Sequence, residues 1–538
     1  MSAPDGDRRT VIIGPPPTPN GDLHVGHLAG PYLAADVYAR YLRATGRPVI
    51  YTTGTDDSQT YVVATAAKRG STPQALAERS WHQIRDTLGL MGIAVDGFAP
   101  FDDGYRAAVL DFVGRLHAAG RLRTRTVPLP YGARSGEFLV EGLVSGGCPV
   151  CLTESRGGLC ETCGHPNGNA DLIDPRSVVD PSEPVEIRPA RILVLPMEEY
   201  RTRLSEYFRA RESRWRPHIV HLMREVLARP LPDFPVTYPT GWGIPAPFPE
   251  TPGQVINAWV EGMPASMYCT EFAQRRLGER PTRYDDLWRA EHDIRLVYFL
   301  GFDNAYFWGV THLALLLAHD GRYVVPDTIV CNEFYELENE KFSTSKGHVV
   351  WSRDLLAEVP RDLVRYYLAL TAPEHARTNF GRAALVKIAG TRLVEPWNRL
   401  AASVDKAVAE LGAAGSALPV SAPARARSTA MIERFAACYE LDGYCLPRAA
   451  DLIAAHIERL ADAAGVEASR ERLGDLFAEL RTLVTAAAPI LIDLAAATGV
   501  DEPFAAGASR ATVEPFAVPL LEPARPARPT GRLLCTSP

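Results

Sequence analysis

Two histidines near the start of the chain stand where a strand gives way to a helix. Residues 15–27 end in His24-Val25-Gly26-His27, just after the short apolar run 10–14. A nucleotide phosphate at such a point would meet free backbone N–H groups, the positive end of a helix and two imidazole donors. Gly26 would let a flat adenine approach the backbone. The alternative is a pair of capping histidines on a surface turn.

A second polar motif lies far along the chain. Residues 341–347 read Lys-Phe-Ser-Thr-Ser-Lys-Gly, with the cations Lys341 and Lys346 on either side of Ser343 and Ser345. Only 5 of the 57 basic residues are lysines, so two of them in one short loop are notable. A flexible ammonium near a triphosphate can follow the charge that builds on a leaving pyrophosphate. Taken alone, the motif is equally compatible with a solvated surface turn.

Four of the nine cysteines form a compact group. Their order is Cys148-x2-Cys151-x8-Cys160-x2-Cys163, which is the spacing of a zinc knuckle. In a cytosolic protein such a group indicates metal binding rather than disulfides. Four thiolates complete the tetrahedron around zinc and leave no position for water. We therefore expect a structural Zn²⁺ rather than a catalytic one.

The elements around the first histidine motif indicate a parallel α/β domain. A buried strand over residues 10–14, a helix over 24–42 and a strand over 48–52 follow one another. Strand-like runs at 295–301 and 323–331 flank a helical stretch over 306–318. In such domains the ligand site lies at the carboxyl ends of the strands.

The rest of the chain divides by composition. We expect the first half of the α/β domain over residues 1–120, an insertion with the zinc knuckle over 121–230 and the second half with the lysine loop over 231–375. An α-helical bundle over 376–512 follows, since apolar residues such as Leu473, Phe477 and Leu480 fall on one helical face. Residues 513–538 form a Pro-rich tail without periodicity, poorly ordered or draped over the surface.

The overall composition is that of a soluble globular protein. The 538 residues are 46% hydrophobic and 22% charged, and the N-terminus lacks the apolar core of a signal peptide. No run approaches the roughly 18 apolar residues of a membrane span. We expect a cytoplasmic protein without a membrane partner. The net charge of -7 neither requires nor excludes tRNA.

Taken together, these motifs resemble a known family. Residues 15–27 resemble the HIGH signature of class I aminoacyl-tRNA synthetases, and residues 341–345 resemble their KMSKS loop. The cysteine knuckle between them is typical of the methionyl enzymes. Residues 53–56, 242–245, 255–259 and 299–303 also follow in the order that methionyl-tRNA synthetases show. The resemblance implies a Rossmann-type parallel-sheet catalytic domain with a zinc-knuckle insertion, followed by a bundle like their anticodon-binding domain.

The same resemblance implies roles for individual residues. His24 and His27 would bind the phosphates of ATP, supplied with Mg²⁺, Gly26 the adenine, and Lys341 and Lys346 the pyrophosphate. Pro17, Thr18, Ser343 and Ser345 would also line the nucleotide site. Asp56 and Asp303 would hold the α-amino group of the amino acid, unless they are strand-end caps. Trp259 would form one wall of the amino-acid pocket, unless it is a core residue.

The amino-acid site departs from the family pattern. Thr344 replaces the second lysine of the KMSKS signature, so adenylation should be slower unless Lys346 substitutes. Trp308 replaces a histidine close to the methionine side chain, and Thr18 replaces a tyrosine. Residues 57–59, Asp-Ser-Gln, replace the usual Glu-His-Gly. A large indole would reshape the cavity, so the amino acid is expected to be smaller than methionine, with glycine or alanine as candidates.

The acceptor end departs as well. Asn398 matches an anticodon-reading asparagine, but no tryptophan follows Trp397, so the aromatic platform for an unstacked base is missing. The preferred hypothesis is an enzyme that activates an amino acid and transfers it to a small-molecule hydroxyl or hydroxylamine in a biosynthetic pathway, with a separate cupin-type partner enzyme. The alternatives are a divergent methionyl-tRNA synthetase that charges tRNA and an inactive, synthetase-like binding module.

Overall fold

The protein has two compact units. The structure is a computed structural model and describes residues 8–342, 347–466, 469–504 and 510–525. The first unit comprises Met1–Asp22, Val49–Asp86 and Val95–Glu333, and the second comprises Leu23–Pro48, Thr87–Ala94 and Phe334–Pro538. Within the described residues, no helix combines the length and the apolar character that crossing a bilayer requires.

A five-stranded parallel sheet lies in the first unit. Its strand order is β15 (Thr328–Asn332), β14 (Arg295–Gly301), β1 (Thr10–Ile13), β2 (Val49–Thr53) and β3 (Gly97–Phe98). Ile12 pairs with Tyr51 on one side and with Val297 on the other. All four residues of β1 are buried, as expected for a parallel sheet covered on both faces. The predicted parallel α/β fold is therefore confirmed, and the carboxyl ends of β1 and β14 flank the switch point where such sheets bind ligands.

Helices and an insertion complete the first unit. The helices are α3 (Thr60–Lys68), α5 (Asp103–Ala118), α6 (Arg201–Arg209), α7 (Pro217–Leu227), α8 (Ala258–Arg276) and α9 (His312–Leu317), while α4 (Pro73–Leu90) continues into the second unit.

The insertion is built on the antiparallel strands β4 (Arg123–Gly132) and β10 (Val185–Leu195), with β11 (Phe234–Pro235) at the edge of β10. It also carries β5 (Val144–Gly147), β6 (Glu154–Arg156) and β9 (Ile173–Ser177), and the hairpin of β7 (Gly158–Leu159) and β8 (Pro166–Asn167). The short strands β12 (Thr237–Tyr238) and β13 (Val255–Ile256) pair just before α8.

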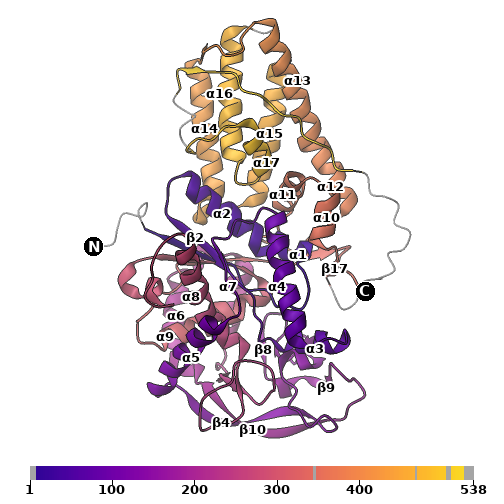
Figure 1. The fold of residues 1–538 in the computed structure, drawn as a ribbon, viewed down its shortest axis with the longest axis vertical. Helices are drawn as coiled ribbons and strands as arrows, with labels where there is room; N and C mark the ends of the chain where they lie inside the picture. The colour runs from indigo at the N-terminus through magenta and orange to yellow at the C-terminus, as the bar shows by residue number, and fades with distance from the viewer. Residues whose placement is uncertain (1–7, 343–346, 467–468, 505–509, 526–538) are drawn as a thin grey trace. The chain divides into compact units, whose positions relative to one another are not determined.

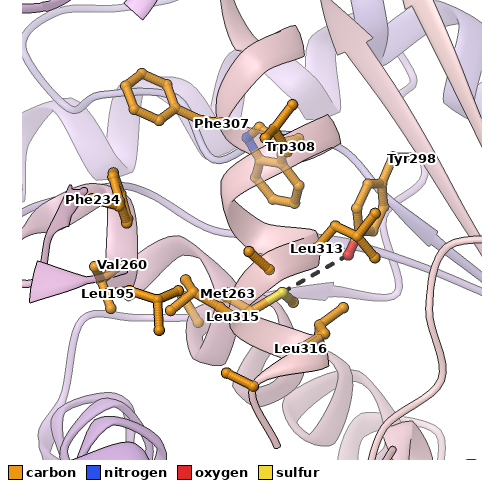
Figure 2. Packing of buried hydrophobic residues seen from close by; sticks show 14 of the residues in the cluster. Leu195, Phe234, Val260, Met263, Tyr298, Phe307, Trp308, Leu313, Leu315 and Leu316 are labelled. Atoms are coloured by element: carbon orange, nitrogen blue, oxygen red, sulfur yellow. Dashed lines mark hydrogen bonds between the residues drawn. The ribbon is translucent and has the colours of Figure 1, made fainter. Parts of the chain in front are cut away.

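The apolar core of the first unit joins α8 to the sheet. Figure 2 shows Met263 of α8 beside Leu195 and Leu315, with its sulfur 3.9 Å from the hydroxyl of Tyr298 on β14. Met263 and Tyr298 are fully buried. Close packing of this kind fixes the start of α8 and the end of β14 relative to each other. Residues at these two places are therefore held rigidly.

The first helix of the second unit is interrupted. We expected a helix over residues 24–42, whereas the chain forms α1 (Val25–His27), a π-type turn over Leu28–Tyr32 and then α2 (Leu33–Ala44). Gly30 adopts a non-helical φ of -77° and ψ of -116°, and Pro31 lacks the N–H group that a regular helix would use. The turn therefore separates the histidine motif from α2.

The second unit is mainly a helical bundle, as predicted. Its small sheet has the order β17 (Glu340–Lys341), β16 (Tyr335–Leu337) and β18 (Thr378–Phe380). The helices are α10 (Ser352–Glu358), α11 (Arg361–Leu370), α12 (Arg382–Ala389), α13 (Glu395–Glu410), α14 (Ala422–Tyr439), α15 (Leu446–Ala464), α16 (Arg470–Ala487) and α17 (Ile492–Thr498). In Figure 1, α13 to α16 lie side by side in orange to yellow.

The described part of the Pro-rich tail lies along this bundle. Strand β20 (Thr512–Val513) pairs with β19 (Leu418–Pro419), and the ring of Phe516 packs 5.4 Å from that of Phe477 on α16. Further along, the Trp397 indole N–H donates to the Pro519 carbonyl at 2.7 Å. Figure 1 shows this yellow segment crossing the helices.

A buried ion pair holds the N-terminal part of the second unit to the bundle. The guanidinium of Arg365 on α11 lies 2.6 Å from the carboxylate of Asp36 on α2, and both side chains are fully buried. Arg365 also donates to the carbonyls of Met91, Pro489 and Ile490. Four partners for one guanidinium compensate the cost of taking the charge out of water.

We expect Arg365→Met to destabilise the protein by about 3–5 kcal/mol, because it leaves the Asp36 carboxylate buried with one fewer cation. Chemical denaturation would measure this loss. Arg361→Met, one turn earlier on α11, is the matched control, since its partner Asp493 is half exposed and such surface pairs contribute at most about 1 kcal/mol. Equal effects of the two substitutions would contradict the assignment.

Candidate active site

Asp56 lies in the loop that follows β2, at the carboxyl edge of the sheet. Its backbone N–H donates to the Pro17 carbonyl at 3.2 Å, which joins this loop to the turn after β1. The Gln59 side-chain amide donates to one carboxylate oxygen at 2.6 Å. The other oxygen is buried without a hydrogen-bond partner among the described residues. Burial raises the pKa of Asp56 to about 8, and the nearby charge of Asp57 adds to this rise. An ammonium group is the ligand that would complete such a site.

Two further buried carboxyl groups, which the sequence analysis did not single out, lie near Asp56. Burial and the charge of Asp56 raise the pKa of Glu261 well above its usual value, and the same causes raise that of Glu141 to about 8. Glu261 is fully buried on α8. The sequence offered one indication of this residue, because Glu261 is the charged residue in the otherwise apolar first turns of α8. The site therefore holds more acidic groups than the sequence indicated.

Asp303 lies in the turn after β14, at the same edge of the sheet. One of its carboxylate oxygens accepts a hydrogen bond from the Asn304 amide at 3.0 Å. A side chain at Gly301 would come within 2.7 Å of that carboxylate, so glycine leaves room for it. Asp303 is thus on the same edge as Asp56, as predicted for residues after parallel strands.

Trp259 is the second residue of α8 and stacks on a second aromatic ring. Its N–H is capped by the Asn257 side chain at 3.0 Å, and its ring lies 3.7 Å from that of Phe307 at an interplanar angle of 12°. Phe307 was not predicted, although it directly precedes the predicted Trp308. The two rings form a flat apolar wall.

Trp308 points into the apolar core. It is 2% exposed and meets the ring of Tyr298 edge-on at 5.1 Å. Figure 2 shows Trp308 beside Tyr298 and Leu313, with Phe307 pointing to the other side of the helical turn. His312, one turn further on, packs on Trp308 at 4.5 Å and hydrogen-bonds the Trp259 carbonyl at 2.7 Å. Trp308 is therefore linked to the Trp259 wall through His312.

The two predicted histidines stack in the second unit. Their rings lie 3.7 Å apart, and the His24 N–H donates to Nδ1 of His27 at 3.2 Å. Burial lowers the pKa of His27 to about 4, so its imidazole is neutral at physiological pH. With Nδ1 accepting, the proton of this neutral ring is on Nε2. His27 thus presents an N–H donor that carries no charge.

The backbone and one aromatic ring hold this motif in place. The Val25 N–H donates to the Val350 carbonyl at 3.0 Å, and the ring of Phe342 stacks on His24 at 4.7 Å. A side chain at Gly26 would meet Phe342 at 3.0 Å, so the ring approaches only because this residue is glycine. Phe342 is the second residue of the lysine motif at 341–347. The start of this motif therefore packs against the histidine motif.

Lys341 ends β17 in the same unit. Its ammonium lies 5.1 Å from the ring centre of Phe334. It is close enough to His24 to contribute, after burial and His27, to the lowered pKa of that histidine. The predicted residues Ser343, Ser345 and Lys346, and the substitution at Thr344, lie outside the described residues.

The four cysteines come together in the insertion. Their sulfur atoms all lie within 4.8 Å of one another, with Cys148 and Cys163 at 3.9 Å and Cys151 and Cys160 at 3.6 Å. A tetrahedral zinc ion with Zn–S bonds of about 2.3 Å requires sulfurs about 3.8 Å apart, so the group fits this metal. All four are free thiols. The arrangement leaves no ligand position for a reacting water.

We expect one zinc ion per chain on these sulfurs, measurable by elemental analysis. Cys160→Ser should abolish stoichiometric zinc and unfold the insertion, because binding of a structural zinc is coupled to folding. Cys331→Ser, which removes a buried thiol elsewhere in the first unit, is the control and should keep the zinc. A protein that contains no zinc would contradict the assignment.

Known proteins are similar to this chain in sequence. Residues 10–404 match the family described as tRNA synthetases class I (M). The methionine–tRNA ligase of Porphyromonas gingivalis is 32% identical over 377 residues, which cover 69% of this chain and 54% of that protein. The methionine–tRNA ligase of Chloroflexus aggregans is 31% identical over 442 residues, which cover 78% of this chain and 73% of that protein. The chain spans about half the length of most of these relatives.

A solved structure has a similar fold. Mycobacterium tuberculosis methionyl-tRNA synthetase in complex with methionyl-adenylate matches with a TM-score of 0.73 at 20% identity, covering 97% of this chain and 100% of that one. The family match extends over both halves of the parallel sheet, the insertion and the start of the bundle. The chain therefore belongs to the class I aminoacyl-tRNA synthetases of the methionyl type.

Proposed function

We propose that the chain activates an amino acid with ATP and transfers the acyl group to a small-molecule hydroxyl or hydroxylamine. In the first step a carboxylate oxygen of the amino acid attacks the α-phosphorus of ATP. The bond to the β-phosphate breaks, and pyrophosphate leaves. In the second step the acceptor oxygen attacks the acyl carbon, and AMP leaves.

The residues of the candidate site suit the first step. Asp56 would hold the α-ammonium group, and the Trp259–Phe307 wall would face the side chain. His24, His27 and Lys341 would contact the phosphates, where neutral N–H donors stabilise the charge that develops during transfer. Pro17, Thr18, Gly26 and the residues of the 343–346 loop would complete the nucleotide site, with Mg²⁺ accompanying ATP.

The observation that carries the choice of acceptor concerns Asn398, the residue proposed as a counterpart of an anticodon-reading asparagine. Its side-chain amide donates to the Leu521 carbonyl at 3.0 Å, and its side-chain oxygen accepts from the Leu521 N–H at 2.8 Å. Both polar ends of the amide are therefore used by the chain's own tail. A nucleotide base would have to displace this segment before Asn398 could read it. This supports an acceptor other than tRNA.

A divergent methionyl-tRNA synthetase that charges tRNA is the second candidate, and the family match over residues 10–404 favours it. The two differ in their amino acid and their acceptor. The proposed enzyme uses an amino acid smaller than methionine, an expectation taken from the sequence, in which Trp308 stands where the family has a histidine; its indole packs against Tyr298 and His312. It works with a separate cupin-type enzyme on its product. An inactive binding module is disfavoured, because the rings of His24 and His27 stack and a hydrogen bond fixes the orientation of His27.

The test is pyrophosphate exchange and charging by the purified protein. We expect exchange of pyrophosphate into ATP with glycine or alanine at a rate at least about tenfold above that with methionine, since one or two pocket contacts discriminate by this much. With total tRNA we expect no acylation. Efficient methionylation of tRNA would establish the second candidate, and the absence of exchange with every amino acid would establish the inactive module.

A further inference from the structure

A histidine directly after the zinc knuckle faces an acidic residue of α7. His165 follows Cys163 and Gly164, and its Nε2 lies 3.2 Å from one carboxylate oxygen of Glu225. The other oxygen of Glu225 lies 3.0 Å from Nε2 of His221, one turn earlier on the same helix. The knuckle does not need these groups, because its four sulfurs already complete the coordination of a zinc ion. The roles proposed above for the activation step use none of the three.

The hydrogen bonds of His165 decide which of its ring nitrogens can bind a ligand. Nδ1 lies 3.2 Å from the Cys163 carbonyl oxygen, which can only accept, so Nδ1 carries the proton of the neutral ring and Nε2 has the lone pair. Nε2 is buried and makes no hydrogen bond within the described residues, and the whole residue is 8% exposed. Two acceptors, Nε2 and a carboxylate oxygen of Glu225, therefore face each other and need a cation between them. Donation of the other ring N–H to a backbone carbonyl is typical of metal-bound histidines.

The geometry favours a metal ion over a proton as this cation. A proton would form a directional hydrogen bond, as it does between Nε2 of His117 and the carboxylate of Glu250 at 3.1 Å. His165 and Glu225 are similarly close but are not aligned for such a bond. A tetrahedral zinc ion with bonds of about 2.0–2.1 Å keeps its nitrogen and oxygen ligands about 3.3 Å apart. The observed separations of 3.2 and 3.0 Å are close to this value.

The zinc knuckle holds His165 in this place. The Cys160 N–H donates to the His165 carbonyl at 3.0 Å, and the Gly164 N–H donates to the Cys160 carbonyl at 2.8 Å. Gly164 has a positive φ of 75°, and a side chain there would come within 2.9 Å of Leu222 on α7. Glycine therefore lets the end of the knuckle approach the helix closely enough to bring His165 to Glu225.

The third ligand lies at the surface. The side chain of His221 is 78% exposed and that of Glu225 is 43% exposed, so an ion can enter from solvent and the His221 ring can rotate to meet it. A histidine and a glutamate four residues apart on a helix lie on the same face. Imidazole and carboxylate ligands suit zinc and neighbouring first-row metals. Three protein ligands leave a position for water, so this ion should exchange more readily than the ion in the knuckle.

We propose that His165, His221 and Glu225 form a second metal site, which takes a divalent first-row transition metal such as zinc from solution. The ion joins the end of the knuckle to α7, which packs into the apolar core of the first unit through Leu222 and Met223. Metal binding therefore stabilises the first unit in addition to the structural zinc. The site requires neither ATP nor an amino acid.

Calorimetric titration of zinc into the untagged full chain, which retains its knuckle zinc, tests the site. We expect one additional ion per chain with a dissociation constant on the order of micromolar. His165→Gln and Glu225→Gln should each weaken this binding about tenfold or more, since even the outer partners of metal ligands contribute about 10–100-fold. His117→Gln, which removes a histidine that pairs with Glu250 elsewhere in the first unit, is the matched control and should leave zinc binding unchanged.

Cobalt identifies the ligands of the added ion. Cobalt on nitrogen and oxygen gives weak visible bands, whereas a thiolate ligand adds an intense ultraviolet charge-transfer band, and we expect the weak bands alone. Added zinc should raise the melting temperature of the wild type but not that of Glu225→Gln, and the two proteins should melt together without added metal. Zinc binding that survives both substitutions, or cobalt bound by thiolates, would overturn the inference. Absence of an additional ion would overturn it as well, and would identify the contact of His165 with Glu225 as an ion pair.

Discussion

Replacement of His27 by alanine is expected to lower amino-acid-dependent pyrophosphate exchange by about 100-fold. His27 is partly buried, its Nδ1 accepts from the His24 backbone N–H, and its lowered pKa of about 4 keeps the ring neutral. The orientation of the Nε2–H donor is thus fixed before the substrate binds. Such preorganisation allows a donor to stabilise charge that develops only during the reaction. Because the group is already neutral, the exchange rate should not change with pH between about 6 and 8 through this residue.

The control for this prediction is His292→Ala, which removes an exposed imidazole from the first unit. It should leave exchange unchanged. His27→Gln, whose side-chain amide can place an N–H donor near the position of Nε2, should restore part of the rate. A loss smaller than about threefold on His27→Ala would mean that the phosphates bind elsewhere.

Replacement of Asp56 by asparagine is expected to raise the KM for the amino acid in the exchange reaction by about 100-fold. The substitution keeps the shape of the side chain and removes the negative charge that would pair with the substrate's ammonium group, and loss of one partner of a buried charge pair costs this much. The KM for ATP should change little. Asp174→Asn, at an exposed position of the insertion, is the control.

The same carboxylate predicts a dependence on pH. Burial raises the pKa of Asp56 to about 8 in the free protein. Only the ionised form attracts an ammonium group, so the KM for the amino acid should fall as the pH rises from 6 to 8 and level off above the pKa. In Asp56→Asn this slope should disappear. A wild-type KM that is constant over this range would show that the carboxylate is already ionised or is not the ammonium partner.

Much of the architecture could be predicted from the sequence because it depends on local patterns. Strand β14 begins and ends where its apolar run does, at Arg295 and Gly301. The cysteine spacing alone sufficed to group four sulfurs, since two short turns bring each pair together. The histidine motif was recognisable from its residue types and its position between a strand and a helix, whereas the approach of Phe342 to Gly26 is known only from the structure.

Other features depend on contacts between distant segments, which no local pattern reveals. The interruption after α1 follows from Gly30 and Pro31, but the partner that fixes α2, Arg365, lies 329 residues further along the chain than Asp36. Glu261 is two residues after Trp259, yet only the fold brings it near Asp56. The second ring of the Trp259 wall, Phe307, likewise comes from a different element.

The sequence by itself determined the residue types of the candidate site and their order, because nucleotide and zinc binding each require particular side chains at particular spacings. Only the tertiary structure decided which of these side chains are buried, and therefore which are ionised. Burial is what makes His27 a neutral donor and Asp56 a carboxyl group with a raised pKa. The tail that occupies Asn398, and the approach of His165 to Glu225, arise from packing between segments that are far apart in the chain.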